Sequence, residues 1–364
     1  MKPRISILLP VWNAEETLSI CLRSCLRQRE TDWECILVDD GSTDRSLEIA
    51  RSFADRDSRF RVHGHRHVGL IPTLNAGIPL CRAPLIARMD ADDWMHRDRL
   101  HLQARALEEN PALDAVGSFV RMFPRDEMRD GRRAYEAWLH SQTDRATIWR
   151  ERFIECPIAH PTLSIRKSIL TEFGYRDRLW PEDYDLLLRL LRRGPCVGII
   201  KRRLLGWRDG RGRLSRIDGR YAQSRFTACR AWHLHRDFLL DQETYILWGH
   251  GKTGRSLRRE LSALGHRVAF IIDVHPRRIG ERIGGALVIS PEELAQLPDF
   301  SRLGILEASL GLSVAVDSGT DLQSTLGPNR PIVVSVAGVR PRNEIRAALG
   351  AIGLREGEHF VCAA

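Results

Sequence analysis

Residues 85–93 read Leu-Ile-Ala-Arg-Met-Asp-Ala-Asp-Asp, an apolar run that ends in three carboxylates. An earlier run of the same form, Cys-Ile-Leu-Val-Asp-Asp at residues 35–40, ends in Asp39 and Asp40. Open α/β sheets bind ligands at the carboxyl ends of their parallel strands. An Asp-x-Asp there supplies the oxygen ligands that Mg²⁺ or Mn²⁺ prefers, and such ions are usually shared with substrate phosphates. The two runs therefore predict an α/β sheet whose acidic edge binds a metal ion and a phosphorylated ligand.

Strands and helices alternate around these two runs. Strand-like segments are expected at residues 5–9, 35–38 and 84–89, and helical patterns at residues 15–27, 46–53, 68–80 and 98–109. This alternation is typical of βαβ units and of a mostly parallel sheet flanked by helices. Residues 116–242 are less regular, with one amphipathic helix expected at residues 183–193.

A second domain is expected near the C-terminus, because 364 residues exceed the size at which a single hydrophobic core keeps growing. An apolar strand at residues 245–248 leads into Gly249, Gly251 and Gly254; a helical run follows, and a second strand ends in Asp273. An acid about 20 residues after such glycines is typical of a dinucleotide-binding fold. We predict domains at residues 1–240 and 243–364, the second being a smaller, Rossmann-like α/β domain.

The net charge of +9 is concentrated in the first domain. Residues 1–242 carry 42 basic and 34 acidic side chains, whereas the remainder carries 14 and 13. A basic domain suits an anionic donor, an acidic glycan or an anionic membrane surface, and no motif supports nucleic acid as a partner. No apolar run approaches the roughly 20 residues that a membrane span needs. We therefore expect a cytoplasmic protein or one that is peripheral at the inner membrane, with its eight cysteines as buried side chains in a reducing compartment.

Four motifs follow one another in the first domain: Pro10-Val11-Trp12-Asn13, residues 38–44, residues 74–78 and residues 89–93. In this order and spacing they resemble the family-two glycosyltransferases of the GT-A fold. Further along the chain, residues 181–186 (Pro-Glu-Asp-Tyr-Asp-Leu) resemble the acceptor-side Glu-Asp motif of that family. The resemblance covers residues 4–220 and implies inverting, metal-dependent sugar transfer without a covalent intermediate.

Strand ends are expected to supply the donor site. Trp12 offers an aromatic face to a base, and Asp40 or Asp39 can accept a hydrogen bond from the imide N–H of uracil or thymine. Asp90 is expected at the ribose and Asp92 at the metal ion, with Asp93 in support. The alternative is an acidic turn that only caps the next helix.

A glycine- and arginine-rich loop at residues 206–215 could close over the diphosphate through Arg208, Arg211 and Arg213, although a solvated basic loop is the alternative. The expected donor-binding residues are Pro10, Val11, Trp12, Glu15, Asp39, Asp40, Asp90, Arg208 and Arg213.

Asp183 is expected to be the general base, because in-line displacement at an anomeric carbon needs a base on the face opposite the leaving group. Glu182 or Asp185 is the alternative base, and stabilisation of a helix N-terminus is the alternative role. His160 and Trp180 are expected on the acceptor side; for His160, a packed or surface position is the alternative.

The resemblance implies transfer from a nucleotide-diphosphate sugar, UDP- or dTDP-linked, to a glycan or lipid-linked hydroxyl in cell-surface polysaccharide synthesis. The alternative is a bifunctional enzyme whose second domain binds NAD(P) through its glycines and Asp273 and modifies a nucleotide sugar. That domain could equally serve packing, dimerisation or regulation, since it carries no Tyr-x-x-x-Lys pair for hydride transfer. A third interpretation, a non-catalytic nucleotide-sugar sensor, is opposed by the presence of Asp90, Asp92 and Asp183.

Overall fold

The structure is a computed structural model that describes residues 2–210, 213–296 and 330–364. The chain divides into two compact units: Met1–Arg152 with Cys156–Ala222, and Phe153–Glu155 with Gln223–Ala364. The expected boundary at residues 240–243 therefore lies inside the second unit. Helix α10 (Gln223–Arg236) belongs to that unit because it packs against α11 (Lys252–Ala263).

The first unit is built on one mixed sheet with the strand order β3-β2-β1-β4-β7-β6-β8-β5. The four strands β3, β2, β1 and β4 are mutually parallel, as expected from the alternation of strands and helices. β7 is antiparallel to both β4 and β6, β8 is parallel to β6, and β5 is antiparallel to β8. The strands are β1 (Ile5–Val11), β2 (Trp33–Asp39), β3 (Phe60–Gly64), β4 (Leu85–Arg88), β5 (Trp94–Met95), β6 (Ala115–Phe123), β7 (Ser164–Arg166) and β8 (Val197–Arg208).

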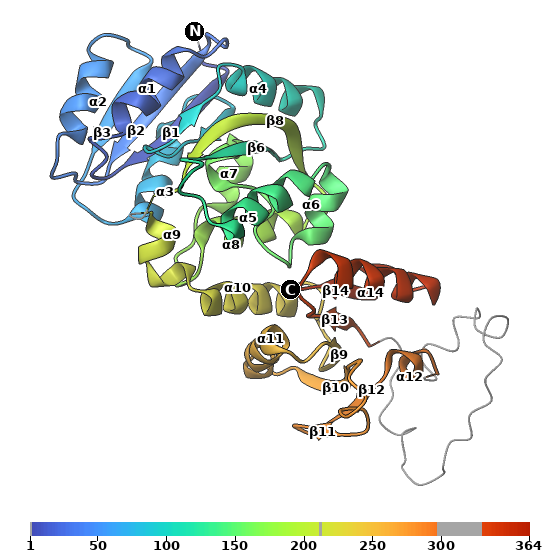
Figure 1. The fold of residues 1–364 in the computed structure, drawn as a ribbon. Coiled ribbons are helices and arrows are strands. Elements are labelled where there is room, and N and C mark those ends of the chain that lie inside the picture. The colour runs from blue at the N-terminus through green and yellow to red at the C-terminus, as the bar shows by residue number, and fades with distance from the viewer. Residues whose placement is uncertain (1, 211–212, 297–329) are drawn as a thin grey trace. The chain divides into compact units, whose positions relative to one another are not determined.

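Helices cover both faces of the parallel strands, which is why β1 and β2 are buried along their whole length. Ile5 and Ile7 belong to the core that also contains the apolar residues of α1 and α4, while Leu8 faces Gly77 of α3. Figure 1 shows α1 and α2 beside the parallel strands. The helices are α1 (Leu18–Leu26), α2 (Ser46–Ala54), α3 (Leu70–Leu80), α4 (Arg99–Glu109), α5 (Asp130–Ser141), α6 (Arg145–Glu151), α7 (Lys167–Phe173), α8 (Glu182–Leu191) and α9 (Leu214–Ile217), with 3₁₀ turns η1 (His160–Thr162) and η2 (Gly219–Tyr221).

The second unit contains a six-stranded sheet in the order β11-β12-β10-β9-β13-β14. Its five strands from β12 to β14 are parallel, and β11 forms an antiparallel edge. Within its described residues the strands are β9 (Thr244–Trp248), β10 (Arg267–Ile272), β11 (Arg282–Ile283), β12 (Ala286–Ile289), β13 (Ile332–Val334) and β14 (Phe360–Cys362). The helices described there are α10, α11, α12 (Pro291–Gln296) and α14 (Val339–Ala351).

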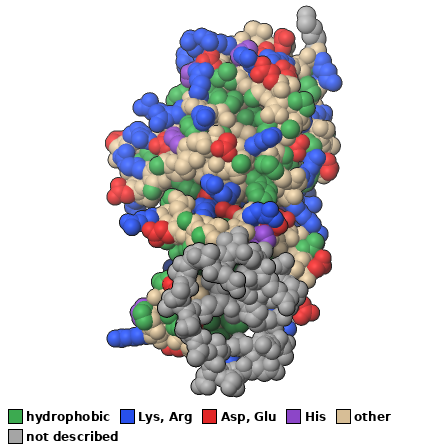
Figure 2. Space-filling view, turned by 90° about the vertical axis from the view of Figure 1, so that its right-hand side faces the viewer, with side chains coloured by type: hydrophobic (Ala, Val, Ile, Leu, Met, Phe, Trp, Pro, Cys, Tyr) green, Lys and Arg blue, Asp and Glu red, His purple; other side chains and the backbone are tan. Residues whose placement is uncertain are grey.

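In the described part of the chain, no helix combines the length and the apolar character that crossing a bilayer requires. Basic side chains are interspersed with acidic ones on the face shown in Figure 2. All eight cysteines belong to the described residues, where they are buried and form no disulfide.

Candidate active site

The acidic residues lie at the carboxyl edge of the parallel strands, as the sequence pattern predicts. Asp39 ends β2 opposite Val11 of β1, and the amide of Asp40 donates to the carbonyl of Val11 (2.8 Å). The amide of Met89, just after β4, donates to the carbonyl of Leu8 (3.1 Å). These backbone bonds bring the ends of three strands to one edge, where Asp39, Asp40 and Asp90 follow.

Asp90, Asp92 and Asp93 form a cluster in which one carboxylate oxygen of each lies within 4.8 Å of the others. Burial, and then the charge of Asp90, raise the pKa of Asp92 to about 6. Burial and the charges of Asp92 and Asp90 raise the pKa of Asp93 well above its ordinary value. Its Oδ1 accepts from the amide of Arg208 (2.7 Å), but its Oδ2 is enclosed without a hydrogen-bond partner among the described residues. Hard oxygen ligands and an excess of negative charge fit a divalent cation, which would relieve the repulsion.

Asp90 is held by a buried arginine that the sequence analysis missed. Nη2 of Arg88 lies 2.6 Å from Oδ1 of Asp90, and Arg88 is 3% exposed. Burial opposes ionisation of Asp90, but the charge of Arg88 holds its pKa below the ordinary value. Asp90 is therefore the member of the cluster that stays negative.

The donor-side residues on β1 have different surroundings. Pro10 and Val11 are buried within the strand, and Val11 packs in the core, so only their backbone faces the edge. Trp12 is 50% exposed, and its ring stacks on His67 at 4.6 Å. Glu15 accepts from the amide of Arg45 (3.1 Å), directly before α2. Trp12 is thus the β1-end side chain with an aromatic face open to solvent.

Asp39 and Asp40 differ in what they contact. Both oxygens of Asp40 accept backbone hydrogen bonds, from Val68 (2.8 Å) and Gly69 (2.9 Å), so this residue anchors the start of α3. Oδ2 of Asp39 accepts from the amide of Ser42 (3.2 Å), while its buried Oδ1 has no partner within the described residues. Of the two predicted imide acceptors, Asp39 has the unused oxygen.

The segment at residues 206–215, which was predicted to be a loop that closes over the diphosphate, begins as part of a strand. Arg208 is the last residue of β8, and its Nε donates to the carbonyl of Asp92 (2.9 Å), so it braces the acidic turn from a strand. Placing it in a closing loop was wrong, because β8 pairs with β6 as far as this residue. Arg213 lies over the ring of Trp207 (4.5 Å) and favours the ionised form of Asp92. Arg211 lies outside the described residues.

Glu182 and Asp183 occupy the first turn of α8, as expected. Glu182 is 2% exposed and accepts from the hydroxyl of Tyr221 (2.7 Å). Burial and the charge of Asp183 raise the pKa of Glu182 to about 7. Asp183 is half-buried, and its Oδ1 accepts from the amide of Tyr184 (2.7 Å). Asp183 is therefore the more accessible of the two carboxylates.

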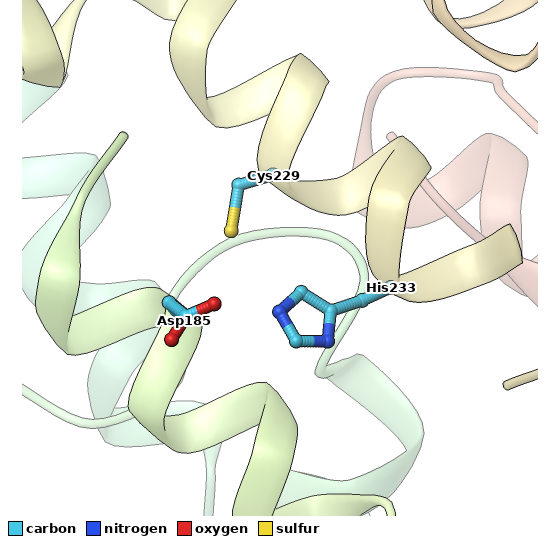
Figure 3. A group of neighbouring side chains, drawn as sticks. All are labelled: Asp185, Cys229 and His233. Atoms are coloured by element: carbon cyan, nitrogen blue, oxygen red, sulfur yellow. The ribbon is translucent and has the colours of Figure 1, made fainter. Parts of the chain in front are cut away.

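The third carboxylate of this turn has a structural role. Asp185 is buried and pairs with Arg189 (2.8 Å), which also donates to the carbonyl of Gly174 (2.7 Å). The indole N–H of Trp180 donates to Asp185 (3.3 Å), which fixes this predicted acceptor-side residue against α8. Figure 3 shows Asp185 on α8; it also shows Cys229 and His233, one turn apart on α10 of the second unit.

His160 is buried in the η1 turn, and its Nε2 lies 2.9 Å from the hydroxyl of Tyr175. Burial and the nearby charge of Arg88 lower the pKa of His160 to about 3, so its imidazole is neutral. Burial also raises the pKa of Tyr175, to which Glu182, Asp183 and Asp90 contribute. Tyr175 is therefore within electrostatic range of Asp90 on the donor side and of Glu182 and Asp183 on the acceptor side, and His160 is bonded to it.

The sequence patterns did not point to Arg88, Tyr175 or Tyr221 as site residues. An arginine inside an otherwise apolar strand, two residues before Asp90, was the available signal for Arg88. No local pattern marks the two tyrosines, because the chain brings them to the site only through its tertiary fold.

In the second unit the glycines form the turn between β9 and α11. Gly249 adopts a left-handed φ of 91°, and a Cβ on Gly254 would lie 2.2 Å from the carbonyl oxygen of Gly249. Gly251 precedes α11 as its N-cap, with open space around it. Asp273 follows β10 and pairs with Arg278 (2.7 Å).

These features define the GT-A-like class of α/β transferases: a parallel half-sheet with carboxylates at its edge, extended by a mixed half. The solved structure of TarS from S. aureus in complex with UDP-GlcNAc has this fold, with a TM-score of 0.52, 15% identity, and 64% of this chain and 67% of TarS covered. The family model described as "Glycosyl transferase family 2" matches residues 6–174.

Curated relatives agree with the family model. A Bacillus subtilis protein named "Putative glycosyltransferase EpsE" is 31% identical over 200 residues, which cover 53% of this chain and 68% of EpsE. The uncharacterized glycosyltransferase EpsJ of the same organism is 40% identical over 117 residues. The chain spans 34% of the length of EpsJ and 48% of a Haemophilus influenzae relative. The chain belongs to glycosyltransferase family 2.

Proposed function

We propose that this chain transfers a sugar from a UDP- or dTDP-linked donor to a hydroxyl of a glycan or lipid-linked acceptor, with inversion, in cell-surface polysaccharide synthesis. The observation that carries the proposal is the position of Arg88 beside Asp90 and within electrostatic range of Glu182. One cation thereby connects the donor-side carboxylates to the acceptor-side pair. The names of similar proteins add support, since TarS binds UDP-GlcNAc and an Escherichia coli relative is a chondroitin synthase.

On the donor side we assign Asp92 and Asp93 to a divalent cation and Asp90 to the ribose. When bound, Mg²⁺ or Mn²⁺ stabilises the negative charge on the departing diphosphate. Arg213, beside the same carboxylates, adds positive charge where the diphosphate would lie. The exposed ring of Trp12 stacks on the base, and the unused oxygen of Asp39 accepts from its imide N–H.

On the acceptor side we assign the general base to Asp183. It is half-buried, so an acceptor hydroxyl can reach it, whereas Glu182 is enclosed and bonded to Tyr221. A base takes the proton from the attacking hydroxyl as the bond to the anomeric carbon forms. We propose that Glu182 is the charged neighbour of Asp183 above its own pKa of about 7, where the cation Arg88 favours its ionised form.

The test is a screen of nucleotide sugars with Mn²⁺ that measures transfer and donor hydrolysis. Asp92→Asn and Asp183→Asn should each reduce transfer, the latter by roughly 10²–10⁴-fold, the usual contribution of a general base. The exposed Asp55→Asn is the matched control and should transfer at the wild-type rate. Transfer by Asp183→Asn at the control rate would refute the base assignment, and failure with every donor would refute the proposed function.

For the location we propose the cytoplasm, with peripheral contact to the inner membrane when the acceptor is lipid-linked. The support is the positive charge of residues 1–242, which suits an anionic surface.

For the second unit we propose a Rossmann-like module that binds a nucleotide through Gly249, Gly251, Gly254 and Asp273. The strand order β12-β10-β9-β13-β14 corresponds to the order 3-2-1-4-5 of doubly wound nucleotide-binding sheets. His250, in the glycine turn, is 5% exposed, and its Nδ1 has no hydrogen-bond partner among the described residues. Modification of a nucleotide sugar with NAD(P) remains the alternative for this unit.

Binding of NAD, NADP and UDP to the full chain tests this second proposal. Gly251→Ala leaves the fold room for its methyl group but places it at the helix N-terminus, so it should abolish binding to the second unit. Gly350→Ala, in α14 and equally unobstructed, is the control. The proposal is refuted if Gly251→Ala binds as many molecules of NAD, NADP and UDP per chain as the wild type does.

A further inference from the structure

Arg88 is a buried cation whose hydrogen-bonding capacity is only partly used. It is 3% exposed on β4, and Nη2 makes the 2.6 Å contact with Asp90. Its Nε and Nη1 are enclosed with no hydrogen-bond partner among the described residues. A buried guanidinium that satisfies few of its five N–H groups is costly, and an apolar side chain would fill the same position at lower cost. Arg88 therefore needs a reason other than stability.

The groups around Arg88 supply that reason. Asp90 lies on the donor side, and both His160 and Tyr175 are within electrostatic range of Arg88. Glu182, on the acceptor side, is also within electrostatic range of the guanidinium. Besides Arg88, the charged or titratable groups of the described residues that act on Glu182 include Asp183 on α8, Tyr221 on η2 and Tyr175. Arg88 is the cation among these groups, and it favours the ionised form of Glu182.

We propose that Arg88 is a positioning residue that holds Asp90 toward the donor and stabilises the negative charge of the Glu182–Asp183 pair. The proposal rests on the proposed function, because it deepens the roles of the same site. Arg88 acts through these carboxylates and does not contact the reacting atoms. The same guanidinium thereby serves donor binding and base catalysis.

Arg88→Met and Arg88→Lys test the two roles separately, by steady-state kinetics across pH 5–9. Arg88→Met removes a charge-assisted hydrogen bond, so the donor KM should rise roughly 10- to 100-fold. The acidic limb of the pH profile of kcat/KM should also move to higher pH, since Glu182 loses the cation that lowers its pKa. Arg88→Lys keeps the charge but not the planar guanidinium. Its pH profile should therefore be close to that of the wild type, while its donor KM should stay raised.

Arg166→Met is the matched control. Arg166 lies on β7, pairs in register with Leu85 of β4, and donates to the backbone carbonyls of Leu113 and Leu107. A donor KM and pH profile in Arg88→Met that match those of Arg166→Met would overturn the proposal. The wild-type chain is measured in the same experiment. Transfer by the wild type supports the proposed function whatever the variants do, whereas no transfer by the wild type would count against the proposed function and not against the role of Arg88. If Arg88→Met does not fold, Arg88→Lys decides alone, and wild-type donor KM in that variant refutes the positioning role.

Discussion

Glu182→Gln should stabilise the first unit at alkaline pH and have little effect at acidic pH. Burial and the charge of Asp183 raise the pKa of Glu182 to about 7 from its ordinary value of 4.5, although Tyr221 and Arg88 oppose the shift. Because the folded-state pKa is the higher one, folding favours the protonated carboxyl. Its contribution to stability is fully present below pH 4.5 and is lost as the pH rises through about 7. This difference between the folded-state and ordinary pKa values lowers the free energy of unfolding of the wild type by roughly 3 kcal/mol above pH 8.

Urea denaturation at pH 5 and pH 8, followed by tryptophan fluorescence, measures this difference. Seven of the nine tryptophans lie within residues 1–222, so the signal reports mainly on the first unit. The amide introduced by Glu182→Gln would keep an oxygen acceptor for Tyr221, so the substitution removes the charge and little else. Glu16→Gln, at an exposed glutamate, is the control and should show no such pH dependence. A stability difference between Glu182→Gln and the wild type that is the same at both pH values would refute the reasoning.

Three further predictions concern the donor side. Mn²⁺ at a hundredfold excess over its Kd should raise the unfolding free energy by about 2.7 kcal/mol in the wild type and by little in Asp92→Asn, as measured by thermal unfolding with EDTA as the reference. Trp12→Ala should raise the donor KM roughly 5- to 100-fold, because stacking of a base on an aromatic ring is worth about 1–3 kcal/mol, and Trp12→Phe should restore most of it. Asp40→Asn should destabilise the fold by about 1–3 kcal/mol through the lost acceptor for Val68 or Gly69, with the donor KM nearly unchanged. A large rise in KM at constant stability would instead identify Asp40 as a base-recognising residue.

The helices and buried strands of the first unit could be predicted because their apolar periodicity is local. The helix expected at residues 98–109 is α4 (Arg99–Glu109), and the strand expected at 84–89 is β4 (Leu85–Arg88). β3 (Phe60–Gly64) was missed, since this edge strand is only partly buried and carries Arg61 and His63. The long strand β8 was missed for a related reason: its centre is exposed and basic, and only its pairing with β6 makes it a strand.

For the site, the sequence predicted which residues lie close together but not which contacts each of them makes. It grouped Asp39 with Asp40 as candidates for one role, yet the structure commits both oxygens of Asp40 to the backbone before α3. It assigned Arg208 to a closing loop, although strand pairing holds this residue against the acidic turn. Such assignments depend on contacts between residues far apart in the chain, and a single sequence contains no record of them.

The strand that carries Arg88 explains why the site forms where it does. β4 is the boundary of the sheet: it is parallel to β1 on one side and antiparallel to β7 on the other. A parallel neighbour ends at the same edge as β4, so Trp12 after β1 and Asp39 at the end of β2 lie at the edge where Asp90 follows β4. An antiparallel neighbour begins at that edge instead, and Ser164 of β7 is in register with Ala87 of β4. The η1 turn with His160 therefore enters the sheet beside the last residue of β4. The change of strand direction is thus what allows one buried arginine to face donor-side and acceptor-side groups together, and an apolar residue at the same position would leave the two sets of carboxylates without a common cation.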